Sequence, residues 1–167
     1  AGGHRFYTQT DTEILVHLYE DLGPAMLDKL NGQFAFAIWD AGQKALFLAR
    51  DRMGIRPLYY HRSGKRLVFG SEIKAVFADS AISRQIDHQS LSDVFTCWTP
   101  VDGQTPFQGI RQIPAGHFAV FSKSGLQVEP YWRISFDAER SANGNGKISL
   151  RSCAEELEAL LIDATRI

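Results

Sequence analysis

Residues 33–50, with the sequence QFAFAIWDAGQKALFLAR, decide the fold class of this chain. Phe34, Phe36 and Ile38 recur at every second position, which is the period of a β-strand with one apolar face. After a short turn, residues 45–49 are apolar at odd-numbered and even-numbered positions alike. A strand that is apolar on both faces is typical of a sheet covered on both sides. The sequence therefore predicts a β-hairpin that lies between two layers of structure.

Helical and strand periodicities alternate outward from this hairpin. Apolar residues three and four positions apart predict a helix at 12–22, and Gly23-Pro24 ends it and starts a second helix. The other predicted elements are a hairpin of residues 58–61 and 67–70, a short helix through Ala78, a helix around 91–95, and a hairpin of residues 117–121 and 126–128. Periodicity alone therefore predicts an α+β fold.

Side-chain oxygens stand at the predicted helix starts as candidate N-caps. Thr10 and Asp11 precede the first helix, and Asp87 precedes the helix around 91–95. Ser71-Glu72 precedes the short helix between them. We expect these side chains to accept hydrogen bonds from the backbone N–H groups of each first turn.

Composition and charge exclude several classes of function. The chain has 167 residues, of which 44% are hydrophobic and 22% charged, as in an ordinary globular protein. Its 18 Lys and Arg balance 19 Asp and Glu to a net charge of -1, so no overall field attracts nucleic acid or anionic lipid. No apolar run approaches the roughly 20 residues of a membrane span. We expect a cytoplasmic protein without nucleic-acid or membrane partners.

The spacing of the cysteines and histidines indicates neither a disulfide framework nor a metal site. Cys97 and Cys153 are the only cysteines and are interpreted as reduced thiols, with Cys97 packed between Phe95 and Trp98. The histidines have neither short spacing nor a nearby cysteine ligand: they are His4, His17, His61, His88 and His117. The sequence therefore predicts no metal site.

The composition changes near residue 133. Residues 137–147 contain almost no side chain that could enter a core, so residues 133–150 are predicted to be a linker. Ser152 with Glu155 forms a capping box before an apolar helical stripe, which predicts a helix in residues 151–167. No stop signal ends this helix, and we expect the natural protein to extend beyond both ends of the chain.

Residues 49–60 place four charges between a buried strand and the next one. Charges in such a position must be paired or solvated. Two interpretations stay open: a structural Arg–Asp network that holds a turn, and a binding role. Spacing alone favours the structural one.

Several blocks together resemble the glutamine-hydrolysing asparagine synthetases. In family order they are Thr10-Asp11-Thr12-Glu13, residues 31–40 (NGQFAFAIWD), residues 49–60 (ARDRMGIRPLYY) and residues 69–75 (FGSEIKA). Residues 107–117 and Pro130-Tyr131-Trp132 resemble the segment that joins the two domains of that family. The similarity covers nearly the whole chain.

This resemblance implies an N-terminal-nucleophile hydrolase-like αββα sandwich, here incomplete because the N-terminal strands are missing. It assigns residues 1–132 to the C-terminal part of a class II glutamine amidotransferase domain and residues 151–167 to the start of an ATP-pyrophosphatase-type synthetase domain. In the family an amino-terminal Cys attacks the glutamine amide. Since Ala1 stands first here, we expect no catalytic residue in this chain and no activity from it alone. The segment itself needs no cofactor, while ATP and Mg²⁺ belong to the absent synthetase domain.

Three residues match functional positions of the family. Asp11 matches the aspartate that binds the α-amino group of glutamine, although Thr10 replaces the commoner serine before it. Its alternative role is that of a helix cap. Gln33 and Ile55 match positions near the ammonia passage, where Ile55 is the more suitable lining residue because it is apolar. Their alternative is a position in the core or at a sheet edge.

Three functions stay open on the sequence alone. The first is a fragment of an enzyme that hydrolyses glutamine and uses the ammonia with ATP to convert aspartate to asparagine. The second is a class II amidotransferase with another acceptor, as in relatives linked to natural-product or polysaccharide synthesis. The third is a catalytically silent interaction module. The expected partners are glutamine and the synthetase domain, and a homodimer is an open expectation because the family is commonly dimeric.

Overall fold

The computed structural model describes residues 3–101, 103–135 and 149–166. The chain divides into two compact units, Ala1–Arg133 and Ile134–Ile167. The first unit contains both β-sheets and the helices that precede α5 (Leu150–Ala164).

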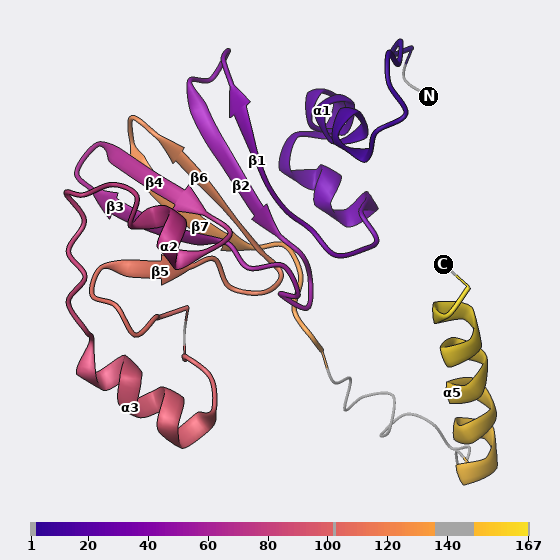
Figure 1. The fold of residues 1–167 in the computed structure, drawn as a ribbon. Coiled ribbons are helices and arrows are strands. Elements are labelled where there is room, and N and C mark those ends of the chain that lie inside the picture. Colours follow the sequence, from indigo (N-terminus) through magenta and orange to yellow (C-terminus); the bar gives the residue numbers. More distant parts are fainter. Residues whose placement is uncertain (1–2, 102, 136–148, 167) are drawn as a thin grey trace. The chain divides into compact units, whose positions relative to one another are not determined.

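A four-stranded antiparallel sheet forms the centre of the first unit (Figure 1). Its strands stand in the order β1 (Ala35–Asp40), β2 (Ala45–Arg50), β6 (His117–Ser122) and β7 (Gly125–Pro130). Phe36 is opposite Ala49, and Leu48 is opposite Ala119. The two predicted hairpins are confirmed, and they join through β2 and β6 into one sheet.

A second antiparallel sheet has the order β4-β3-β5. It consists of β3 (Tyr59–Ser63), β4 (Arg66–Gly70) and β5 (Ile110–Gln112). The hairpin β3–β4 follows the sequence prediction, whereas β5 is not among the predicted elements. β5 has three residues, too few to show a strand period, and it is a strand because it pairs with β3.

Strand β2 is covered on both faces, as its sequence predicts. On one face, Phe47 and Ala49 pack with Met26 and Leu27 of the short 3₁₀ helix η1 (Gly23–Lys29) and with side chains of α1 (Asp11–Leu22). Figure 1 shows α1 beside β1 and β2. On the other face, Leu48 packs with side chains of the second sheet, so the two sheets stack face to face.

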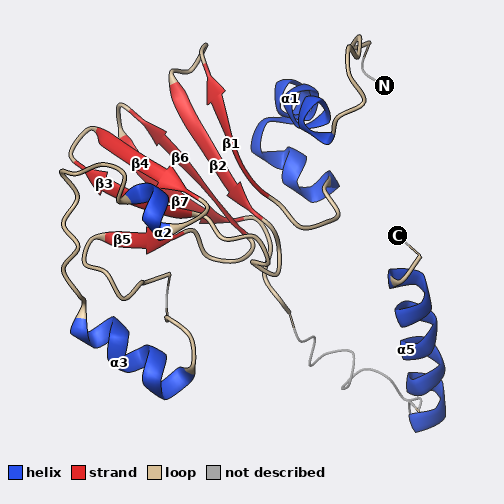
Figure 2. Cartoon of the chain, viewed as in Figure 1, coloured by secondary structure: helices blue, strands red, loops and turns tan. Residues whose placement is uncertain are grey.

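The outer face of the second sheet carries another helical layer. Val76 of α2 (Ile73–Val76) packs with Ile110 of β5 in a third apolar cluster. The first unit is therefore built as helix, sheet, sheet, helix, with α3 (His88–Cys97) as a further helix (Figure 2). This layering agrees with the predicted α+β fold and its αββα order of layers.

The predicted N-caps are correct for one helix and wrong for two. Asp87 accepts a hydrogen bond from the Ser90 N–H at 2.9 Å, and this bond lowers the pKa of Asp87. Thr10 is the N-cap residue of α1, but its side chain makes no capping bond. The Glu72 side chain likewise does not cap α2, which ends at Val76 rather than Ala78.

Glu13, in the first turn of α1, binds the segment that precedes the helix. The Glu13 carboxylate accepts hydrogen bonds from the backbone N–H groups of Tyr7 and Thr8, both at 2.7 Å, and from the Thr8 hydroxyl. These donors lie in the segment that leads into the helix. The result is a fixed approach of residues 7–10 to the start of α1.

The second unit contains the helix α5 (Leu150–Ala164). Ser149 caps it by accepting a hydrogen bond from the Ser152 N–H at 3.0 Å. The prediction that Ser152 is the cap is therefore wrong by three residues, because Ser152 donates its N–H instead of supplying the acceptor. Most of the predicted linker 133–150 consists of residues 136–148, which lie outside the described residues.

Candidate functional site

A cavity of about 510 Å³ opens where four segments of the first unit meet. The segments are the start of α1, the start of β1, the loop between β2 and β3, and the residues before α2. The lining residues are Asp11, Thr12, Leu15, Gln33, Phe34, Ala35, Phe36, Arg56, Pro57, Ser71 and Glu72. All of them except Leu15 belong to the four sequence blocks that carry the family resemblance. The fold thus brings blocks that are separate in sequence to one site.

Asp11 is the first residue of α1 and lies at the cavity wall with an exposed side chain. Its carboxylate accepts a hydrogen bond from the Thr12 hydroxyl at 3.4 Å. The helix begins after Thr10, so Asp11 stands inside the first turn rather than at the N-cap position, and its predicted alternative role as a cap is wrong. An acidic side chain in the first turn also suits the helix dipole.

Gln33 lines the same cavity as Asp11 and stands two residues before the edge strand β1. Its side chain is exposed, which agrees with the sheet-edge alternative and not with a core position. Ile55 lies in the β2–β3 loop and is 56% exposed, so it is not a core residue either. Ile55 is not among the residues that line the cavity, whereas the next two loop residues, Arg56 and Pro57, are.

The Asp51 side chain joins two segments of the cavity wall, the start of β1 and the β2–β3 loop, by hydrogen bonds. Its side chain is 1% exposed, and its carboxylate accepts hydrogen bonds from the N–H groups of Ile55 and Arg56 at 2.9 Å and of Phe34 at 3.3 Å. Phe34 and Arg56 both line the cavity. Burial pushes the pKa of Asp51 upward, but the backbone donors outweigh burial and hold the pKa below its ordinary value.

The Arg50 side chain binds two carbonyl oxygens of the same loop and a third beyond strand β5. Its guanidinium donates to the carbonyl oxygens of Arg56 at 2.8 Å, Gly54 at 2.5 Å and Ile113 at 2.7 Å. Burial lowers the pKa of Arg50, and the charge of Asp51 acts in the opposite direction. Both side chains thus bind main-chain groups, and the geometry supports the structural interpretation for Arg50 and Asp51, while Arg56 of the same segment lines the cavity.

Gly54 and Tyr131 complete this support. Gly54 has a positive φ of 66°, and a Cβ there would lie 2.9 Å from Arg50 Nη2 and 3.0 Å from the Ala115 Cβ. The Tyr131 hydroxyl donates to the Arg50 carbonyl at 2.9 Å. Burial and the nearby Asp51 charge raise the pKa of Tyr131 to about 12. The loop is therefore fixed by donors, acceptors and close packing at once.

The two cysteines do not belong to the cavity. Both are free and exposed, so the reduced thiols expected from the sequence are in place, but the packed environment predicted for Cys97 is wrong. Phe95 and Trp98 beside it are 79% and 92% exposed. The side chain that α3 buries is that of Ser90, near its other end, and Trp98 follows the helix with a left-handed backbone (φ 60°).

Two histidines that are far apart in sequence meet in space. The rings of His4 and His17 stack with centroids 4.4 Å apart. No signal in the sequence indicates the meeting, because His4 reaches α1 through the irregular segment before it.

The comparison with protein families decides the assignment. Residues 1–132 match the model of the glutamine amidotransferase domain. The chain belongs to this family. The resemblance inferred from the sequence motifs is confirmed for the glutamine amidotransferase domain, which contains the cavity and the charged network described above.

Relatives of this amidotransferase domain include biosynthetic enzymes and an amidase. The chain is 37% identical over 157 residues to the glutamine-hydrolyzing asparagine synthetase 3 of Bacillus subtilis, and the match covers 93% of the chain and 26% of that protein. It is 32% identical over 137 residues to the amidase chry2 of Gibberella zeae, and this match covers 81% of the chain and 20% of that protein. The chain thus spans about a quarter or less of these relatives.

A solved structure supports the fold. The chain resembles the glutamine phosphoribosylpyrophosphate amidotransferase of B. subtilis with a TM-score of 0.55 and 22% sequence identity, over 80% of this chain and 25% of that one. This likeness shows the fold of the amidotransferase domain. Within the part of the chain that the structure describes, no helix has the length and apolar character to cross a membrane.

Proposed function

We propose that the cavity at the start of α1 is the glutamine-binding part of a glutaminase site. The observation that carries the proposal is that Asp11 and Gln33, from separate segments, line one cavity in a glutamine amidotransferase domain. The exposed Asp11 carboxylate accepts hydrogen bonds from the α-ammonium of glutamine. A carboxylate at this place selects an amino acid over a simple amide, which has no ammonium group.

Arg50 and Asp51 position this site and do not touch the substrate. Their hydrogen bonds fix the β2–β3 loop and the start of β1, so that the cavity keeps its shape before glutamine binds. A preorganised wall reduces the entropy that binding must overcome. Ammonia released at the cavity is expected to pass near Gln33 and Ile55, and of these Ile55 offers the apolar surface that keeps ammonia neutral.

We assign no nucleophile to the described residues. Cys97 and Cys153 are exposed and are not among the residues that line the cavity. The resemblance to asparagine synthetases supplies the amino-terminal Cys of the whole enzyme as the expected nucleophile. In this proposal the present residues bind and orient glutamine, and inactivity of the isolated chain stays a prediction.

For the whole protein, we propose that the ammonia serves the ATP-dependent conversion of aspartate to asparagine. The name of the B. subtilis relative supports this acceptor. ATP and Mg²⁺ belong to the synthetase part, and α5 is proposed as its beginning, after the linker. The cytoplasmic location and the homodimer also stay predictions.

A different acceptor is the second candidate function. The match to the amidase chry2 favours it, because a relative with another name shares the same segment. Synthesis assays with aspartate as the only acceptor distinguish the two. A silent interaction module predicts instead that the whole protein releases no ammonia from glutamine.

Substitution of Asp11 tests the glutamine site in the whole protein that carries this chain. Asp11→Asn replaces the charged acceptor by a neutral amide, and a hydrogen bond to a charged group contributes about 1.5–3 kcal/mol. We expect kcat/KM for glutamine to fall about 10- to 100-fold. Synthesis driven by added ammonium salt should keep its rate, because it bypasses the glutamine site.

The matched control is Asp28→Asn, which removes another exposed carboxylate of the same unit at a position outside the cavity. This variant should keep normal glutamine kinetics. If Asp11→Asn also kept normal glutamine kinetics and only unfolded earlier, Asp11 would be a structural residue and the proposal would fail.

A further inference from the structure

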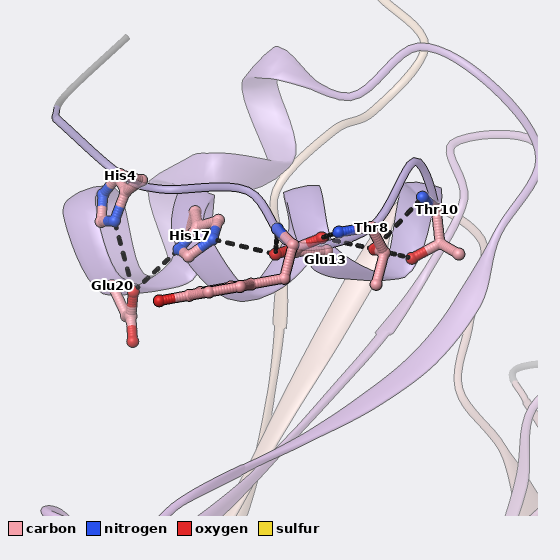
Figure 3. A network of polar contacts seen from close by, with 7 residues as sticks. His4, Thr8, Thr10, Glu13, His17 and Glu20 are labelled. Atoms are coloured by element: carbon pink, nitrogen blue, oxygen red, sulfur yellow. Dashed lines mark hydrogen bonds and ion pairs between the residues drawn. The ribbon is translucent and has the colours of Figure 1, made fainter.

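The stacked histidines belong to a wider group of ligand-type side chains on the outer side of α1. His4 comes from the segment before α1, and His17 and Glu20 come from α1 itself (Figure 3). One ligand atom from each of the three lies within 4.8 Å of the others. His4 and His17 are largely covered, with side chains 23% and 19% exposed. The group lies apart from the cavity of the proposed glutamine site.

One carboxylate oxygen faces both imidazole rings. Glu20 Oε2 lies 3.2 Å from His17 Nδ1 and 3.7 Å from His4 Nδ1. In a tetrahedral zinc site, bonds of about 2.0–2.2 Å place neighbouring ligand atoms about 3.4 Å apart. The two observed separations bracket this value. The two edges that meet at Glu20 are therefore spaced as such a site requires, and the third lies within 4.8 Å.

The other nitrogen of each ring faces a second carboxylate. His4 Nε2 lies 2.8 Å from Asp21 Oδ1, and His17 Nε2 lies 3.8 Å from Glu13 Oε1. The Nε2 atom of His17 is buried without a hydrogen-bond partner. Histidines that bind metals commonly donate their second N–H to a carboxylate, which fixes the tautomer and turns the free nitrogen toward the metal. His4 has that arrangement, whereas His17 Nε2 only faces the Glu13 carboxylate at 3.8 Å.

Glu13 is fixed in the place where it can serve this role. Its carboxylate accepts the N–H groups of Tyr7 and Thr8. These hydrogen bonds hold the carboxylate on the side of α1 that carries His17. Figure 3 shows the resulting chain of contacts from His4 through Glu20 and His17 to Glu13 and Thr8. Together with Asp21, these acids supply negative charge around the imidazoles.

We propose that His4, His17 and Glu20 bind a divalent transition metal ion of the zinc class. The two Nδ1 atoms and a Glu20 oxygen are the protein ligands, Glu13 and Asp21 orient the rings, and water completes the coordination. Two imidazoles and a carboxylate form a ligand set that zinc accepts and that magnesium or calcium does not favour. The ion ties the segment 4–10 to α1 and so steadies the approach to Asp11.

Zinc binding to the purified full chain tests the proposal by competition with a chromophoric chelator. Cys97→Ser and Cys153→Ser are present in every sample, because exposed thiols bind zinc on their own. We expect one zinc ion per chain and a tetrahedral cobalt absorption spectrum when Co²⁺ replaces Zn²⁺. Zinc should also raise the unfolding temperature, because it binds the folded chain.

The decisive variants are His4→Gln and Glu20→Gln. Glu20 is 57% exposed, so its replacement leaves the packing intact even where a histidine variant disturbs it. Both should lose the zinc ion and the cobalt spectrum, while Glu13→Gln and Asp21→Asn should weaken zinc roughly 10- to 100-fold. His88→Gln, an exposed histidine of α3, is the control and should bind zinc normally. Zinc binding that is absent from the parent chain, or unchanged in Glu20→Gln and His4→Gln, overturns the proposal.

Discussion

Replacing Asp51 by Asn probes the support behind the cavity with the smallest change of shape. The two Asp51 oxygens divide their donors evenly: Oδ1 accepts from Met53 and Ile55, and Oδ2 accepts from Phe34 and Arg56. In Asn, one oxygen becomes an NH₂ group, which is itself a donor. Whichever way the amide turns, two backbone N–H groups then face a donor at a site that is 1% exposed.

The size of the effect follows from these two lost acceptors. Leaving a buried donor without a partner costs about 1–3 kcal/mol. We therefore expect Asp51→Asn to reduce the free energy of unfolding by about 2–6 kcal/mol, a large fraction of the roughly 5–15 kcal/mol of an ordinary domain. Urea unfolding of the full chain, followed by circular dichroism at pH 7, measures it. Asp28→Asn is the control and should stay within about 0.5 kcal/mol of the parent.

Acidification provides a second readout for the same variant. The pKa of Asp51 is lower in the folded than in the unfolded chain, so its stabilising contribution is present above the unfolded pKa of about 4 and is lost as pH falls through the folded pKa. The difference between parent and Asp51→Asn should shrink on acidification below about pH 4. Equal stabilities at pH 7, or a difference that does not change down to pH 2, would refute this account of Asp51.

Two further predictions concern the same support. Gly54→Ala should destabilise the chain more than Gly64→Ala, because both glycines have φ near 60° but only at Gly54 does a Cβ meet Arg50 at 2.9 Å; equal losses in urea unfolding would show that backbone strain alone matters. Tyr131→Phe should cost about 0.5–1.5 kcal/mol at pH 8 through the lost hydrogen bond to Arg50. Since the pKa of Tyr131 is raised to about 12, the parent keeps this contribution below the unfolded pKa of about 10 and loses it toward pH 12, and an unchanged difference at pH 11.5 would contradict the assignment.

Local patterns identified the elements that have enough residues to show a period. The hairpin of β1 and β2, the helix α1 and the hairpin of β3 and β4 each follow from side-chain spacing. The strand β5 does not, because three residues carry no period. Asp87 caps α3 from the position that the sequence indicates. At α1 no side chain caps the first turn, and Glu13 instead binds N–H groups of the segment before the helix.

For the candidate site, too, the sequence indicates some residues and the tertiary structure decides the roles of others. Motifs in family order are enough to indicate Asp11 and the charged segment, and the family assignment confirms the domain to which they belong. The roles of the charged side chains required the tertiary structure. Arg50 binds the carbonyl of Ile113, 63 residues away, and Asp51 binds the N–H of Phe34, 17 residues away.

By itself, then, the sequence determined the α+β class, the hairpin enclosed between two layers and the glutamine amidotransferase family. These follow from side-chain periods and from motif order, which both depend on near neighbours along the chain. Only the tertiary structure decided that Gln33 and Asp11 share a cavity, that Cys97 is exposed, and that His4 meets His17. Contacts of this kind depend on how irregular segments return to the sheets, and no local period of the sequence carries that information.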